Sequence, residues 1–206
     1  FVKFSENMLR IVLGACKIDF SLGGDEPFAS WYTGSIDSTD RGQTWSDPSP
    51  EIRIFPEWTE LYGASNPHPL SDGSFLLAAI GTLGRDIQWH SGVTFSKAPD
   101  YEYSAPVIIA NNPERNYSDT DLVRLSDGRF LAVIREHVTL QSVYSYSEDE
   151  GRTWSPIQPT NFKGSNIKLW NLRSGAIACA YRDEDPSRRG VSLSVSHDFG
   201  NNWELL

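Results

Sequence analysis

Three short stretches of this chain are near copies of one another. They read S-x-D-x-G-x-[TN]-W and occupy Ser38–Trp45, Ser147–Trp154 and Ser196–Trp203. The residues before each stretch alternate as those of a half-buried strand do. A motif that recurs once per supersecondary unit is typical of repeat architectures, so this box constrains the fold more than any other feature of the sequence.

The chemistry of the box is that of a turn. Its Asp carboxylate can accept hydrogen bonds from the backbone N–H groups just beyond it, as in an Asx turn. The Gly supplies a position with positive φ, and the Trp is expected to pack on the sheet after the turn. We therefore interpret Asp40, Asp149 and Asp198 as structural residues.

A degenerate copy is expected between the first two boxes. The boxes start 109 residues (147 − 38) and then 49 residues (196 − 147) apart, so one copy is missing from the longer gap. Ser96 opens that copy and Tyr103–Pro106 closes it with the aromatic-Ser exit of the other boxes, although the Asp and the Gly are absent. The box starts thus mark units of about fifty residues.

A second motif keeps the same spacing. Leu70–Ala78, Leu125–Ala132 and Leu172–Ala178 each read as strand, tight Gly turn and strand, and Phe4–Leu13 is a fainter copy. Asp-Gly between two apolar runs is a strong hairpin signal. The runs are too short and too rich in β-branched residues for helices. Each unit therefore carries two hairpins, or four antiparallel strands, which is one blade of a β-propeller.

The predicted fold class is all-β, a β-propeller of four-stranded antiparallel blades. We expect one domain over 1–206, with repeats at about 1–48, 62–106, 119–156 and 166–206. A propeller closes into a ring to remove its sheet edges. Because residue 1 falls inside a strand and residue 206 falls just past a box, we expect about four blades of a larger ring.

Composition excludes some classes of partner. The net charge of −9 argues against nucleic acid, and the longest apolar runs, such as Phe75–Ile80, are too short to span a membrane. The basic residues are 13 Arg and 5 Lys, which suits planar recognition of a carboxylate or phosphate, although surface ion pairs account for most of them. Cys16 and Cys179 lie in apolar strands and are expected to be buried free thiols.

No cofactor or metal is expected. The sequence has no zinc signature, no phosphate-binding glycine loop and no nucleophile elbow. Its histidines are too scattered for metal spacing: His68, His90, His137 and His197. The glycosylation sequon Asn116–Ser118 does not by itself place the protein outside the cell.

The boxes resemble the Asp boxes, or bacterial neuraminidase repeats, of the sialidase superfamily, and the resemblance covers all four repeats. It implies a six-bladed propeller in the full protein. In that family the boxes lie on the rim away from the active site. Asp boxes also occur in non-catalytic binding propellers and in other glycan-active enzymes, so the resemblance is more specific for fold than for activity.

The segment Asp119–Arg135 is similar to a sialidase active-site segment. In sialidases an acidic residue before the Asp-Gly turn is a Glu that activates a Tyr nucleophile, and an Arg after the turn grips the sialic acid carboxylate. By position, Asp119 matches the activating acid and Arg135 the arginine. Asp is one methylene shorter than Glu, which places its carboxylate about 1 Å short. Asp121 is a competing candidate on the same strand face.

Further site residues are implied by the same resemblance. Arg188 is similar to the third family arginine, and Arg182 follows its turn Gly by seven residues, as Arg135 does. The charged loop that follows Arg182 reads equally well as a solvated turn with local ion pairs or as part of a site. For the general acid, Asp25 is the first choice and Asp19 the second, although a solvent-facing loop acid is the commoner interpretation of both.

The implied activity is that of a sialidase-type glycoside hydrolase, which removes terminal acidic sugars from glycans with retention through a Tyr nucleophile. The nucleophile and the first arginine would lie outside this chain. An exo-arabinanase or a uronate-directed hydrolase or lyase is the alternative enzyme. A glycan- or protein-binding propeller without turnover is the alternative outside catalysis.

Overall fold

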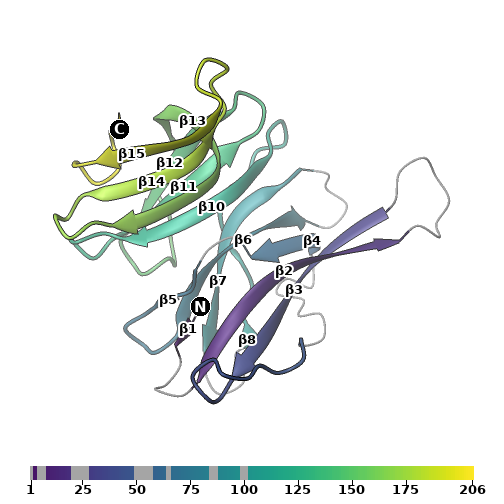
Figure 1. The fold of residues 1–206 in the computed structure, drawn as a ribbon. Helices are drawn as coiled ribbons and strands as arrows, with labels where there is room; N and C mark the ends of the chain where they lie inside the picture. Colours follow the sequence, from purple (N-terminus) through teal and green to yellow (C-terminus); the bar gives the residue numbers. More distant parts are fainter. Residues whose placement is uncertain are drawn as a thin grey trace.

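The computed structural model describes residues 2–3, 8–19, 28–48, 58–63, 66–83, 88–97 and 102–206. Among these residues every regular element is a β-strand, and no helix capable of crossing a membrane is found there (Figure 1). The first nine strands are β1 Val2–Lys3, β2 Leu9–Asp19, β3 Phe28–Ser38, β4 Trp58–Gly63, β5 His68–Pro69, β6 Phe75–Leu83, β7 His90–Lys97, β8 Glu102–Tyr103 and β9 Val107–Ala110. The others are β10 Tyr117–Arg124, β11 Phe130–Glu136, β12 Gln141–Ser147, β13 Gln158–Asn171, β14 Ile177–Asp183, β15 Gly190–Ser196 and β16 Glu204–Leu205. The predicted all-β class is confirmed.

The strands form open antiparallel sheets of consecutive elements. From β10 to β16 each strand pairs with the next, and β13 is shared, because residues 158–163 pair with β12 and residues 164–171 with β14. These strands thus make two four-stranded units, here called the third and fourth units. The second unit has β6 and β7 at its centre with β4 and β9 outside them, and the first is the sheet β1–β2–β3.

Each Asp box folds as its sequence predicts. In the third unit, Asp149 accepts hydrogen bonds from the backbone N–H and the hydroxyl of Thr153, at 2.8 and 2.6 Å. Gly151 has a φ of 91°, and the Trp154 indole N–H donates to its carbonyl at 3.0 Å. Asp40 and Asp198 accept matching bonds in the other two boxes. The three aspartates are therefore turn residues.

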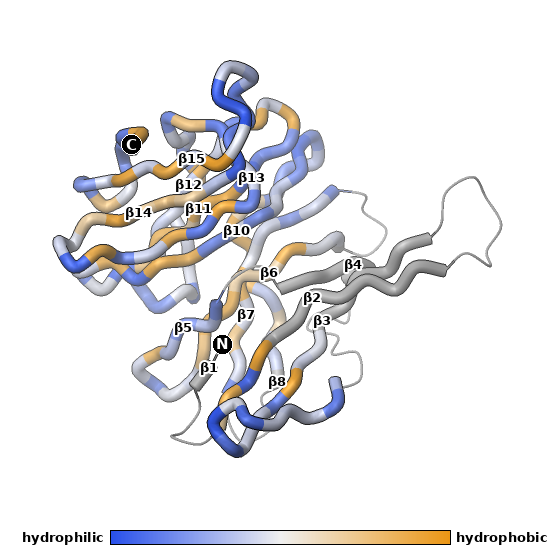
Figure 2. Tube along the Cα trace, viewed as in Figure 1, coloured by the Kyte–Doolittle hydropathy of each residue, from blue (hydrophilic) through white to orange (hydrophobic). Residues whose placement is uncertain are grey.

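The units pack face to face through the two sides of their strands. Leu122 on β10 faces the second unit in one apolar cluster, whereas its neighbour Val123 faces the fourth unit in another. Apolar residues fill most of β11 and β14, while polar residues gather in the loops beside them, as Figure 2 shows. Cys179 is a buried free thiol, as predicted, and the side chain of Cys16 lies outside the described residues.

Strand register separates the predicted motifs into two ends of the sheets. Phe130 pairs with Ser147, so the Asp-Gly turn before β11 and the Asp box after β12 lie at one end, here called the turn end. Arg135 pairs with Ser142 and with Ser118 at the opposite end, here called the arginine end. The structure thus places Asp119 and Arg135 away from the rim that carries the Asp boxes.

Candidate active site

Two equivalent β-bulges shape the arginine end. The pairing of β10 with β11 shifts between Ser118 and Asp121, and Asp119 within that bulge has a φ of 48°. In the fourth unit Asn166 has a φ of 52° within a matching shift of β13. Asp and Asn tolerate this left-handed region better than most residues, and a bulge changes the direction of a side chain. Both units therefore have the bulge, but only the third unit has a carboxylate in it, that of Asp119.

The structure brings Asp119 and Arg135 together, as the sequence predicts. Arg135 Nη1 lies 3.4 Å from Asp119 Oδ2, which also accepts a 3.0 Å hydrogen bond from the Asn166 backbone N–H. The side chains of Arg135 and Asp119 are only 18% and 14% exposed, so their attraction is screened less than that of a surface pair. Arg135 Nε is buried, with no hydrogen-bond partner among the described residues.

Glu184 joins this pair to Arg182. One of its oxygens, Oε1, accepts hydrogen bonds from Ser165 Oγ at 2.6 Å, Arg182 Nη2 at 3.0 Å and Arg135 Nη2 at 3.3 Å. The Ser165 hydroxyl, with help from the two arginines, holds the pKa of Glu184 below its ordinary value. The cluster therefore contains two guanidinium groups and two carboxylates, drawn from β10, β11, β14 and the loop after β14.

Sequence reasoning did not single out Glu184 or Ser165. The available signal was the charged loop after Arg182, one of whose two interpretations was a site. A third residue that it missed is His137, whose Nε2 lies 2.5 Å from Ser118 Oγ. Burial, followed by the positive charge of Arg135, lowers the pKa of His137. His137 follows Arg135 by two residues, which was its only signal in the sequence.

Arg188 is held by carboxylates of its own hairpin. Its Nε lies 3.1 Å from Asp183 Oδ2 and its Nη1 lies 3.1 Å from Asp185 Oδ2. Asp183 is fully buried and also accepts from the Asp185 N–H and the Ser192 hydroxyl, which fixes the loop between β14 and β15. Arg188 thus lies at the arginine end, but its described contacts differ from those of Arg135 and Arg182. Its role in substrate binding stays a prediction.

Of the other candidate acids, only Asp121 has a described side chain. Asp121 is 3% exposed and its Oδ2 accepts a 2.8 Å hydrogen bond from the Leu169 N–H, which ties β10 to β13. Burial raises the pKa of Asp121. Because the bulge lies between Asp119 and Asp121, the simple alternation that placed both on one face does not hold there. Asp19 is the last residue of β2, and its side chain lies outside the described part of the structure. Asp25 also lies outside the described residues.

No metal site accompanies the cluster. Across the described ranges there is no group of three or more His, Cys, Asp or Glu side chains that could hold a metal ion.

The family model for the BNR repeat-like domain matches residues 17–206. The chain belongs to the BNR repeat-like domain family. This confirms the resemblance to Asp-box proteins of the sialidase superfamily, which was drawn from the boxes alone. No curated protein matches the chain significantly.

Solved structures share the fold of this BNR repeat-like chain. A protein of unknown function from Dyadobacter fermentans DSM 18053 has a TM-score of 0.71 at 18% identity, over 96% of this chain and 60% of its own. The Hadza microbial sialidase Hz136 has a TM-score of 0.71 at 18% identity, over 95% and 42%. The alpha-L-arabinanase of Penicillium chrysogenum has a TM-score of 0.65 at 14% identity, over 96% and 59%.

These three structures are longer than this chain and share its fold at low sequence identity. The chain spans between 42% and 60% of the length of the three structures. At 14–18% identity they show a shared fold, and that fold serves glycoside hydrolases of more than one specificity.

Proposed function

We propose that this chain is part of a β-propeller exo-glycosidase of the sialidase type, which removes terminal acidic sugars from glycans. The observation that carries the proposal is the cluster around Arg135. A partly buried guanidinium group lies at the end of the sheets away from the Asp boxes, beside a carboxylate on the neighbouring strand and a second arginine. Arginine is suited to a carboxylate ligand because its planar fork can donate two parallel hydrogen bonds.

The stacking of the units supports the propeller. The third unit buries Val123 and Val133 against the fourth unit. Trp170 and Ala180 are the equivalent positions in the fourth unit, because Trp170 pairs with β14 as Val123 pairs with β11. Leu193 on β15 pairs with Ala180 and so lies on the same face. On this outer face Trp170 is 40% exposed, Leu193 37% and Val191 85%. Apolar exposure of this kind is expected where another sheet packs, and we propose that further blades, six in all, close the ring.

The cluster residues divide naturally into roles. Arg135 and Arg182 would bind the substrate carboxylate. Asp119 would take the proton of the Tyr nucleophile that the family resemblance implies, and Asp25 would protonate the leaving group. Hydrolysis would retain the anomeric configuration, because a covalent glycosyl intermediate forms and is then hydrolysed.

Glu184 must yield part of its position to such a substrate. Its contact with Arg135 Nη2 is 3.3 Å, whereas its bond from Ser165 Oγ is 2.6 Å. The longer contact is the weaker one. A substrate carboxylate can therefore replace Glu184 at Arg135 while Ser165 and Arg182 still hold Glu184.

The test is turnover of a sialoside by the complete protein and its Arg135→Ala variant. Loss of a charge-assisted contact in a partly buried site should lower kcat/KM by about hundredfold or more. Arg173→Ala is the control, because Arg173 is exposed in the turn between β13 and β14, at the opposite end. Unchanged kinetics in Arg135→Ala would remove Arg135 from the site.

A second enzymatic function is favoured by the charge balance of the cluster. Two carboxylates already balance Arg135 and Arg182, and such an arrangement also suits the hydroxyl groups of a neutral sugar, as in an exo-arabinanase. A panel of sialosides, arabinans and uronate-containing glycans separates these enzymes by which sugar is released. Saturable glycan binding without product would favour a binding propeller instead.

A further inference from the structure

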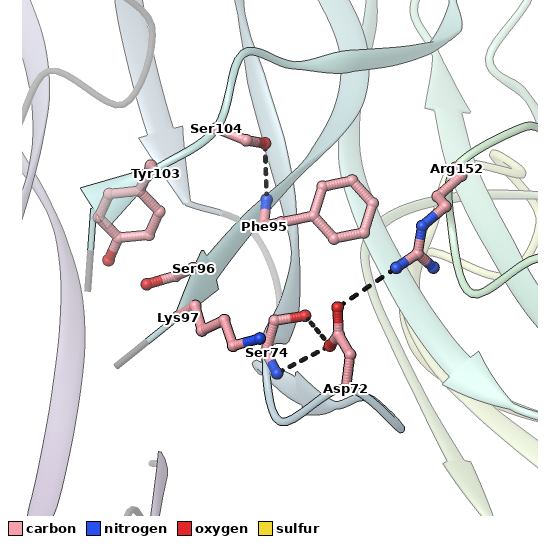
Figure 3. Close-up of a pocket in the computed structure, with 8 residues that line it drawn as sticks. All are labelled: Asp72, Ser74, Phe95, Ser96, Lys97, Tyr103, Ser104 and Arg152. Atoms are coloured by element: carbon pink, nitrogen blue, oxygen red, sulfur yellow. Dashed lines mark hydrogen bonds and ion pairs between the residues drawn. The ribbon is translucent and has the colours of Figure 1, made fainter. Parts of the chain in front are cut away.

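A hollow of about 410 Å³ lies at the turn end, opposite to the Arg135 cluster. It is lined by the end of β7, by the turn before β6, by the Asp-box loop of the third unit and by β8. Figure 3 shows Phe95 at its centre, with Tyr103 on one side and Arg152 on the other. Ser74 and Ser96 are buried, whereas Lys97 and Arg152 are exposed, so the two cations lie at the mouth of the hollow.

The hollow lies at the one box that has lost its box residues. Tyr103 stands where the other boxes have Trp, and the Asp and Gly are missing from this copy. The backbone exit is nevertheless kept, since the Ser104 N–H donates to the Phe95 carbonyl at 2.8 Å, as the Ser155 N–H does to the Tyr146 carbonyl. The exit of the box is therefore kept, while its side chains differ from those of the other boxes.

The charged groups at the mouth are held in place. Asp72 accepts hydrogen bonds from the hydroxyl and the N–H of Ser74, at 2.5 and 2.9 Å, and these bonds lower the pKa of Asp72. Arg152 Nη2 lies 3.4 Å from Asp72 Oδ2, and Arg152 Cζ lies 5.7 Å from the centre of the Phe95 ring. The mouth thus carries one ionised carboxylate and, with Lys97, two cations.

We propose that this hollow is a non-catalytic binding site for an acidic oligosaccharide. The C–H face of a sugar ring would pack on Tyr103, and its hydroxyl groups would bond to Asp72. The sugar carboxylate would be bound by Lys97 and Arg152. Among the lining residues two cations face one carboxylate, and the nearby Glu150, 3.9 Å from Arg152, is itself paired with Arg124 at 2.9 Å. The lining therefore carries a local positive surplus on a chain whose net charge is −9, which favours an anionic glycan over a neutral one.

The test separates this site from the arginine end. Sialyllactose and a triuronate are titrated calorimetrically into the Arg135→Ala protein, which leaves the hollow intact, with maltotriose as the neutral probe. We expect saturable binding of at least one acidic probe, about tenfold weaker when Lys97→Ala and Arg152→Ala are added, because these remove the two cations that bind the sugar carboxylate. Arg173→Ala, at the matching turn of the fourth unit, should leave the affinity unchanged, and circular dichroism confirms that each variant is folded.

The possible outcomes decide the proposal. Absence of binding by both acidic probes, equal binding of maltotriose, or an affinity unchanged by Lys97→Ala with Arg152→Ala each overturns it. Tyr103→Phe should retain affinity and Tyr103→Ser should lose it, because the ring and not the hydroxyl packs on the sugar. Since binding is measured without Arg135, failure here is distinct from failure of sialoside turnover.

Discussion

Gly200→Ala should destabilise the protein far more than Gly175→Ala, although both glycines have positive φ. Gly200 has a φ of 97° and Gly175 a φ of 87°, so a side chain at either position carries a backbone penalty of roughly 1–2 kcal/mol. A Cβ on Gly200 would lie 2.5 Å from Leu131 Cδ2, whereas a Cβ on Gly175 meets nothing within 4 Å. Leu131 is fully buried in the apolar cluster between the third and fourth units, so it has little room to move.

The difference isolates the packing of an Asp box on the preceding unit. Overpacking of a core contributes about 1–3 kcal/mol, so we expect a loss of about 1–2 kcal/mol for Gly175→Ala and about 2–5 kcal/mol for Gly200→Ala. Equilibrium urea unfolding, followed by tryptophan fluorescence, measures both. Gly151→Ala offers a replicate, because its Cβ would lie 2.7 Å from Leu76 Cδ1. Equal losses for Gly200→Ala and Gly175→Ala would show that the box glycine serves the turn alone.

Three further predictions test the charges. Glu184→Gln keeps an acceptor for Ser165 but removes the charge that competes for Arg135. On the proposed function, the KM for an acidic sugar should therefore fall, while the KM for a neutral sugar should not. Steady-state kinetics with both sugars measures this difference. Asp121→Asn keeps the acceptor for the Leu169 N–H. Because burial raises the pKa of Asp121, ionisation of the wild-type carboxyl above the ordinary value of 3.8 costs stability that the Asn variant does not lose. The variant should therefore gain stability relative to the wild type between pH 4 and pH 7, as thermal unfolding at both pH values would reveal. The hydrogen bonds of Thr44 lower the pKa of Asp40 to about 2, so stability from this box is present above 3.8 and is lost as pH falls toward 2, and Asp40→Asn should flatten that part of an acid titration.

Local chemistry explains what could be predicted from the sequence. An Asp box completes its hydrogen bonds within eight residues, as Ser38 to Trp45 show, and an Asp-Gly turn within five, so both can be read without knowing their neighbours. The degenerate second copy could be recognised in the same way, because Tyr103–Pro106 is a local pattern, and in the structure the Ser104 N–H makes the same exit bond as the Ser155 N–H. The close approach of Gly200 to Leu131 could not be read in this way, since it joins different units.

Glu184 was not identified from the sequence because its contacts in the candidate site join residues that are far apart along the chain. Glu184 bonds to Arg135 across 49 residues and to Ser165 across 19, so the charged loop after Arg182 does not reveal which of its acids joins the cluster. The bulge at Asp119 was also hidden, because an Asp in an alternating strand does not reveal that its φ is 48°. The two positions do correspond in the repeats, because Asn166 precedes Gly175 by nine residues as Asp119 precedes Gly128, but this spacing does not reveal the backbone geometry.

The arginine end shows how a repeated unit can acquire a site by few changes. The third and fourth units share the bulge, at Asp119 and Asn166, and share the arginine, at Arg135 and Arg182. What differs is the carboxylate in the first bulge, which accepts from the backbone N–H of Asn166 in the second, so that one unit completes the hydrogen bonds of the other. Glu184 then bridges both arginines at the seam. On the proposed function, the repeat supplies the two arginines, and Asp119 and Glu184 are the residues that break it. We therefore expect substitutions at Asp119 and Glu184 to alter activity without unfolding the sheets.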